Sequence, residues 1–194
     1  NDREGEAASI DVLGLVAADQ GDLAGARQRY EQALAIQRAI GYRRGEGYTL
    51  THLGHALLRL GQPAQAGEAF DQALAIRREL SPGSGASIDD LAGLALAALA
   101  QSKPAEAGRL AAECLAWIET HGLGGIESPT QVYLACFQAL QSSDPPQAAQ
   151  ALEQGYQRLT QLAGAIADAQ LSRAVLEDVP IHRELIAAWQ RVAA

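Results

Sequence analysis

An internal repeat with a period of 40 residues constrains the fold of this chain more than any other feature of its sequence. The segment 13–36 returns at 53–76, with a Leu-Gly pair, a second Gly and a Gln-Ala-Leu-Ala-Ile run in the same places. A third copy lies at 94–115, and a weaker fourth copy runs over 134–155. Because a fixed period of about 20 to 50 residues is typical of solenoids, we expect four stacked units of one kind.

Each unit is predicted to be a pair of antiparallel helices that cross closely. The composition favours helices, because 48% of the residues are hydrophobic and only 5% are aromatic. Gly21 and Gly61 suit helix C-caps, and Pro63, Pro104 and Pro146 suit the first turn of a following helix. Only small residues fit at a close crossing, since bulk would push the helices apart. The expected crossing residues are Gly14, Gly54, Ala95 and Cys136 in the first helices and Ala26, Ala66, Ala107 and Ala148 in the second helices.

These residues resemble the tetratricopeptide repeat, in which a small residue in the first helix, an Ala and an aromatic residue in the second helix, and a capping Gly recur. The resemblance covers nearly the whole chain, and its 40-residue period is similar to the long repeats of bacterial signalling proteins. It implies an all-α fold, a right-handed α-solenoid of four helix pairs with C-terminal capping helices. We expect one domain over 1–194, with repeats at about 7–46, 47–86, 87–127 and 128–167 and a cap at 168–194.

The segments 126–137 and 169–185 carry a second resemblance, to the C-terminal end of large bacterial regulators. In those proteins a nucleotide-hydrolysing signalling module, often joined to a DNA-binding or adenylate cyclase domain, precedes a tetratricopeptide sensor. The resemblance implies partner or ligand sensing within a larger cytoplasmic protein of signalling or transcription regulation. The chain begins with Asn1, and its first residues align with the loop at 41–47, so we also expect that a preceding repeat has been removed.

The end of the chain is predicted to form a helix near 168–179 and a final helix after Pro180. Four apolar residues of the final helix stand at helical spacing and would cover the open edge of the fourth repeat. They are Leu185, Ile186, Trp189 and Val192.

The charge of the chain disfavours nucleic acid and membrane surfaces as partners. The formal net charge is -8, from 23 acidic and 15 basic residues, and such a surface repels phosphate groups and anionic lipids. An RNA-binding helical repeat stays the weakest alternative, since Lys103 is the single lysine. With neither a run of about 18 apolar residues nor a leader sequence, we expect a cytoplasmic location.

No catalytic residue, metal ligand or cofactor is predicted. His52 and His55 lie three residues apart but lack a third ligand, so they are interpreted as polar residues lining a groove. The pair Asp89-Asp90 is expected to stabilise a helix N-terminus, and not to act in acid–base catalysis. Cys114 and Cys136 are expected to be reduced core residues. The chain is therefore not expected to be an enzyme.

The resemblance places a partner-binding groove on the concave side, which is lined by the first helices. We expect a protein or peptide there, or another domain of the parent protein, held above all by Tyr48, His55 and Arg59. The alternatives are self-association through the N-terminal edge and, for Phe137, burial against a neighbouring helix. The groove residues predicted from the repeat register are Asp11, Tyr48, Thr51, His55, Arg59, Asp89, Tyr133 and Phe137.

Overall fold

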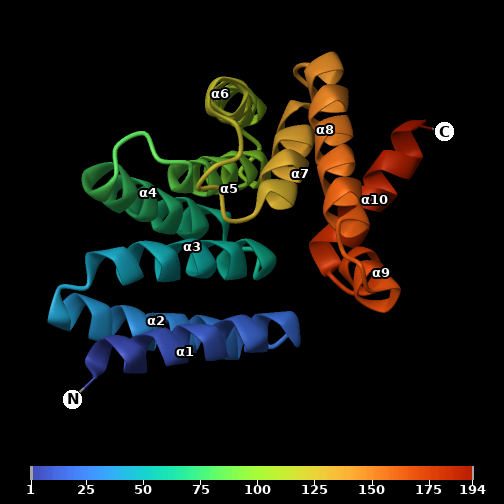
Figure 1. Cartoon of the computed structure of the whole chain (residues 1–194). Coiled ribbons are helices and arrows are strands. Elements are labelled where there is room, and N and C mark those ends of the chain that lie inside the picture. The colour runs from blue at the N-terminus through green and yellow to red at the C-terminus, as the bar shows by residue number, and fades with distance from the viewer. Residues whose placement is uncertain (1, 194) are drawn as a thin grey trace.

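The structure, a computed structural model, describes residues 2–193, and this part of the chain contains ten α-helices and no strand (Figure 1). The helices are α1 (Arg3–Asp19), α2 (Leu23–Ile40), α3 (Arg43–Arg59), α4 (Pro63–Leu80), α5 (Ala86–Ala100), α6 (Pro104–His121), α7 (Pro129–Leu140), α8 (Pro145–Gly164), α9 (Ala169–Glu177) and α10 (Pro180–Ala193).

The first eight helices form four antiparallel pairs, and each second helix also packs against the first helix of the next pair. This arrangement confirms the predicted all-α solenoid of four helix pairs followed by two C-terminal helices. The predicted repeat boundary at 46 falls inside α3. Gly41 ends α2 in the left-handed region, with φ of 70°, and the chain enters α3 only two residues later.

The crossings in the first two pairs are filled by aromatic rings packed on glycines. A Cβ atom on Gly14 would lie 2.5 Å from the Tyr30 ring, and one on Gly54 would lie 2.7 Å from the Phe70 ring. Phe70 also packs against Gly93 of α5, so a single ring of α4 sits between two first helices. The glycines are therefore needed because the ring atoms occupy the space of a side chain.

The C-terminal helices cover the fourth pair. α10 packs against α7 and α8, where Leu185 is buried, Ile186 is partly buried, and Trp189 stacks on Tyr156 with ring centroids 5.1 Å apart. The prediction for Val192 is wrong, because this side chain is exposed near the end of the helix. α10 thus covers the edge of the solenoid with its first three turns.

The two cysteines are buried and free, as predicted. None of the helices within residues 2–193 combines the length and the apolar character that a membrane span requires.

Candidate partner-binding surface

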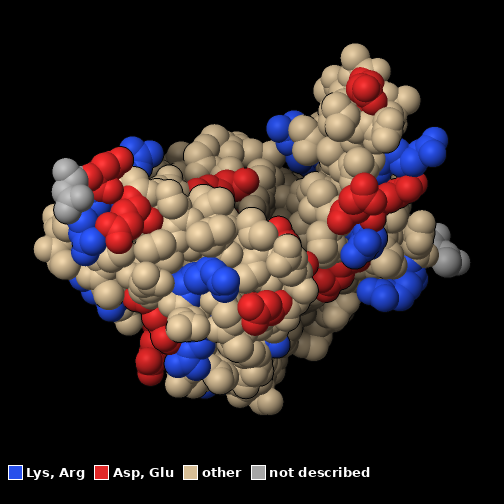
Figure 2. All heavy atoms as spheres, turned by 90° about the horizontal axis from the view of Figure 1, so that it is seen from below, with Lys and Arg blue, Asp and Glu red and all other residues tan. Residues whose placement is uncertain are grey.

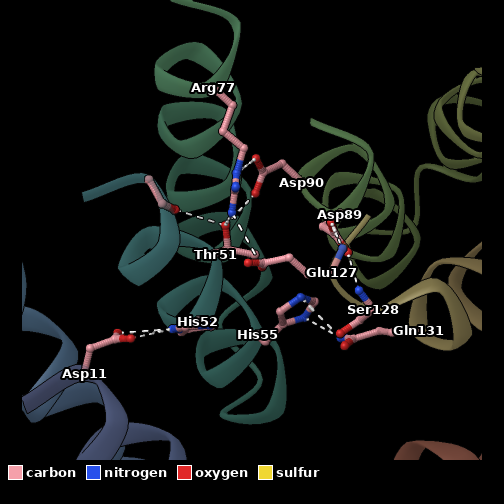
Figure 3. Close-up of polar contacts among 11 residues, drawn as sticks. Asp11, Thr51, His52, His55, Arg77, Asp89, Asp90, Glu127, Ser128 and Gln131 are labelled. Atoms are coloured by element: carbon pink, nitrogen blue, oxygen red, sulfur yellow. Dashed lines mark hydrogen bonds and ion pairs between the residues drawn. The ribbon is translucent and has the colours of Figure 1, made fainter. Parts of the chain in front are cut away.

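The predicted groove residues of the second repeat share one face of α3. Tyr48, His55 and Arg59 are seven and four residues apart, so a helical period of 3.6 residues places them in one row. The row lies between α1 and α5, both of which pack against α3. Figure 3 shows the polar contacts of His55 and of its neighbours Thr51 and His52 in α3.

A buried ion pair lies beside this row. Arg77 of α4 places Nε 2.8 Å from Oδ2 of Asp90 in α5, and Thr51 of α3 donates a hydrogen bond of 2.6 Å to the other carboxylate oxygen (Figure 3). The guanidinium also lies 4.5 Å from the centre of the Tyr48 ring. Burial raises the pKa of Asp90 to about 7, although the nearby Arg77 acts in the opposite direction. These contacts join α3, α4 and α5, so Thr51 stabilises the packing of the helices.

Asp89 fixes the start of α7. Its carboxylate accepts hydrogen bonds from the backbone N–H groups of Glu127, at 2.9 Å, and of Ser128, at 3.1 Å, just before that helix begins. Burial raises the pKa of Asp89 to about 6, against the effect of the two hydrogen bonds. Asp89 also lies in the first turn of its own helix, α5, whereas its neighbour Asp90 forms the ion pair with Arg77.

The two histidines point to different neighbours. His52 Nδ1 lies 3.0 Å from a carboxylate oxygen of Asp11 in α1, whereas His55 lies 3.0 Å from the amide nitrogen of Gln131 in α7. The His55 ring also packs edge-on against Phe70, and burial lowers its pKa to about 4. Within residues 2–193 no group of three or more His, Cys, Asp or Glu side chains is placed to hold a metal ion.

The eight predicted groove residues differ in their access to solvent. Arg59 is exposed, with one guanidinium nitrogen 2.9 Å from the carbonyl oxygen of Ala18 in α1, and Tyr48 and His55 are partly exposed. The other five are buried, so the prediction that they line an open groove floor is wrong. The buried five are Asp11, Thr51, Asp89, Tyr133 and Phe137.

The burial of Tyr133 and Phe137 follows from the surroundings of α7. This helix of 12 residues is packed against by α5, α6, α8 and α10. Both rings therefore belong to the core of the C-terminal half, and the alternative considered for Phe137 is the one that the structure shows.

The surface also has hollows that the repeat register did not indicate. Viewed from the α1 and α2 end, it is hollow between the N-terminal helices and a projecting lobe, with acidic side chains inside and along the hollow (Figure 2). A pocket of about 320 Å³ also lies between α2 and α4. Its lining includes Leu34, Leu50, Leu53 and Leu57, with Arg38 at the polar side. This pocket is lined by α3 as well as by the two second helices, and it is a competing surface.

The structure also reveals residues that the sequence interpretation missed, Arg77 and Gln131. Arg77 follows the apolar Ile76 by one residue, as Gln37 follows Ile36 one repeat earlier, and both polar side chains are buried. The repeat alignment shows this recurrence of a polar residue at a buried position, and it could have pointed to Arg77. Gln131 carries no comparable signal, because its contact with His55 spans 76 residues of sequence.

Comparisons with known proteins agree with this architecture. Residues 6–79 match the family model described as tetratricopeptide repeat. The comparison with curated proteins finds no match. Among 47 matching chains of solved structures is a crystal structure of BtubC (BKLC) from P. vanneervenii, with a TM-score of 0.69 and 15% sequence identity. The match covers 87% of this chain and 68% of that chain, and at this identity it shows the fold alone. Residues 6–79 thus carry tetratricopeptide repeats, and the described chain has a tetratricopeptide-like helical-repeat fold.

Proposed function

We propose that this chain is a scaffold that binds a protein or peptide along the inner face of its first helices, with Tyr48, His55 and Arg59 as its anchors. Tetratricopeptide repeats generally mediate protein–protein interaction, and stacked repeats bind through extended concave surfaces. The observation that carries the proposal is the row on α3, because these three are the predicted groove residues that reach the surface.

The chemistry of the row suits a peptide with neutral or basic groups. Aromatic and Arg side chains are the usual energetic anchors of an interface. The amide of Gln131 beside His55 adds hydrogen-bonding capacity, and the acidic side chains along the hollow in Figure 2 favour a partner without strong negative charge. In a larger cytoplasmic signalling regulator, such a surface senses a partner or another domain of the same protein.

Two alternatives are less well supported. Tetratricopeptide folds are typically non-catalytic, and the clustered polar groups around α3 are engaged in contacts between helices. RNA binding needs a basic surface, whereas the face in Figure 2 mixes blue and red side chains. A scaffold therefore accounts for the surface better than an enzyme or an RNA-binding repeat.

The test compares two triple variants. Peptides selected against the intact chain from a random display library are titrated by calorimetry into Tyr48→Ala/His55→Ala/Arg59→Ala and into Gln28→Ala/Gln32→Ala/Arg38→Ala. We expect the first triple to lose at least about tenfold in affinity, because single anchors contribute about 2 kcal/mol or more. Circular dichroism at the titration temperature establishes that each variant is folded.

The second triple lies on α2, and its Arg38 lines the pocket between α2 and α4. Because Arg38 also donates to Glu46 of α3, circular dichroism must show that this triple keeps the helix content of the intact chain. The triple should bind as the intact chain does. Loss of binding by this triple, together with unchanged binding by the α3 triple, would overturn the proposal and move the site to the second helices. Arg59→Lys adds a matched control, because it keeps the charge and removes the planar guanidinium.

A further inference from the structure

The outer face of α1 is the largest departure from the burial pattern of the repeats. Although α3 buries its apolar residues at two equivalent positions, α1 leaves four large apolar side chains exposed. They are Val12, Leu13, Leu15 and Val16.

The equivalent positions of α3, 40 residues later, show what covers such a face. Leu13 is 55% exposed, whereas its equivalent Leu53 is 9% exposed. Val16 is 46% exposed, whereas its equivalent Ala56 is 2% exposed. The difference arises because α2 packs against α3, so the exposed face of α1 corresponds to a face that a second helix covers.

Two polar contacts set the register of α2 on α3. Gln37 donates a hydrogen bond of 2.9 Å to the hydroxyl of Thr49, and Arg38 donates one of 2.7 Å to the carboxylate of Glu46. Glu46 also accepts from Arg43, three residues before it in its own helix. The interhelical contacts thus use one hydroxyl and one carboxylate of the first helix.

α1 carries the same two acceptors in the same places. Ser9 is equivalent to Thr49, and Glu6 is equivalent to Glu46. Glu6 accepts from Arg3, as Glu46 accepts from Arg43, but its side chain is 46% exposed against 8% for Glu46. α1 therefore repeats the polar pattern of α3 as well as its apolar pattern.

The next interface shows that the polar pattern discriminates between docking helices. At the positions of Gln37 and Thr49, α4 and α5 carry Arg77 and Asp90, which form the buried ion pair. A buried Arg needs a carboxylate partner, because an uncompensated buried charge is costly. The neutral Ser9 on α1 accordingly fits an amide at this position and disfavours a guanidinium.

We propose that the outer face of α1 is an interaction surface for the second helix of a further tetratricopeptide-type helix pair. The docking helix carries an apolar residue, a Gln and an Arg at the positions that Leu34, Gln37 and Arg38 occupy in α2. It covers Leu13 and Val16, its Gln donates to Ser9, and its Arg donates to Glu6. This surface is separate from the row on α3, and the inference does not depend on the proposed function.

The experiment supplies such a helix pair from the chain itself. A second copy of residues 1–40 is joined ahead of the full chain, with Asn1→Gly at the junction so that it corresponds to Gly41. Val16→Cys in the original α1 serves as the reporter, because Cys114 and Cys136 are buried and free. We expect labelling of this thiol in the extended chain to be slower by about tenfold or more than in the unextended chain, since it then requires local opening.

A charge exchange separates specific docking from simple apolar contact. Gln37→Arg in the added copy alone should restore fast labelling, and Ser9→Asp in the original α1 should slow it again by recreating the Arg77–Asp90 arrangement. Labelling that is equally fast with and without the added pair overturns the proposal. Slow labelling that is unchanged by the Gln37→Arg and Ser9→Asp substitutions overturns it as well. Concentration-dependent protection of the unextended chain, with dimers in light scattering, also overturns it, because the occupant is then a second copy.

Discussion

The first two helix pairs and the last two solve the same packing problem with different residues. In the first two, the rings of Tyr30 and Phe70 press on glycines of the first helices. The equivalent positions in the third and fourth pairs hold Ala111 and Leu152, both buried without an aromatic ring. The aromatic ring is thus present in the first two pairs and replaced by an aliphatic side chain in the last two.

The contacts between successive pairs change in the same direction. The first two interfaces contain a buried polar contact, Gln37 with Thr49 and Arg77 with Asp90. At the equivalent position of the third interface α6 carries Ile118, which belongs to the apolar core. Beyond it, α10 covers α8 with apolar side chains. Polar contacts thus set the register at the first two interfaces, whereas the third interface and the C-terminal end are apolar.

The largest expected effect is the loss of an aromatic wedge. Phe70→Ala should lower the free energy of unfolding by about 3 to 5 kcal/mol, because the ring fills the space between α3 and α5. Leu152→Ala, at the matching position of the fourth pair, should cost about 2 to 5 kcal/mol. Urea unfolding followed by circular dichroism measures both. A Phe70→Ala variant less affected than Leu152→Ala would contradict the distinction between the two regions.

The polar interface contacts should differ in cost by their charge. Arg77→Ala leaves the carboxylate of Asp90 buried without its partner, and we expect a loss of about 3 to 5 kcal/mol. Gln37→Ala leaves the hydroxyl of Thr49 without its donor and should cost about 1 to 3 kcal/mol. Equal losses in urea unfolding would mean that Asp90 takes up a proton when Arg77 is removed, as its raised pKa of about 7 allows.

A smaller effect tests the repeat register itself. Ala66 is buried at the crossing of α3 and α4, whereas Ala64 is exposed two residues earlier in α4. Ala66→Leu should destabilise the fold by about 1 to 3 kcal/mol through overpacking, and Ala64→Leu should leave it nearly unchanged. Thermal unfolding of the two variants provides the comparison, and equal melting temperatures would show that the register is wrong.

The fold could be predicted from the sequence because its signals are local and repeated. Gly14, Gly54 and Ala66 recur at a fixed period, and each reports a contact that is made within one helix pair. The end of the stack was harder to predict, since Val192 continues the helical pattern of α10 beyond the point where the helix leaves the core.

The candidate site was only partly predictable, because exposure depends on contacts between distant segments. Tyr133 lies at a groove position of its repeat, but α5, α6, α8 and α10 enclose its helix. Asp89 likewise lies at a groove position, but the chain entering α7 supplies two N–H groups that bind it. Such contacts join segments that no single repeat contains, so the repeat register places a residue on a face without showing whether the face is open.

The smallest expected effect is on the pH dependence of stability, to which His55 of α3 and the two Asp residues of α5 contribute with opposite signs. Burial holds the pKa of His55 at about 4 in the folded chain, below its ordinary value of 6.5. The unfolded chain therefore takes up a proton at this position as the pH falls below about 6.5, while the folded chain does not, and stability is lost by at most about 1.4 kcal/mol per pH unit. The raised pKa values of Asp89, about 6, and Asp90, about 7, act in the opposite sense over this range, since the folded chain binds their protons first.

His55→Gln removes the histidine contribution and leaves those of the two carboxyl groups, so the variant should gain stability relative to the intact chain as the pH falls. Urea unfolding at pH 7.5, 6.5 and 5.5 measures this difference. These pH values lie above the sequence pI of about 4.9, the pH at which solubility is lowest. His121→Gln, at an exposed histidine near the end of α6, controls for the loss of a histidine elsewhere. If the difference between His55→Gln and the intact chain stays constant from pH 7.5 to 5.5, then His55 is not held neutral by burial. Its ring would then be open to protonation, and His55 would serve the row on α3 as a charged group near physiological pH.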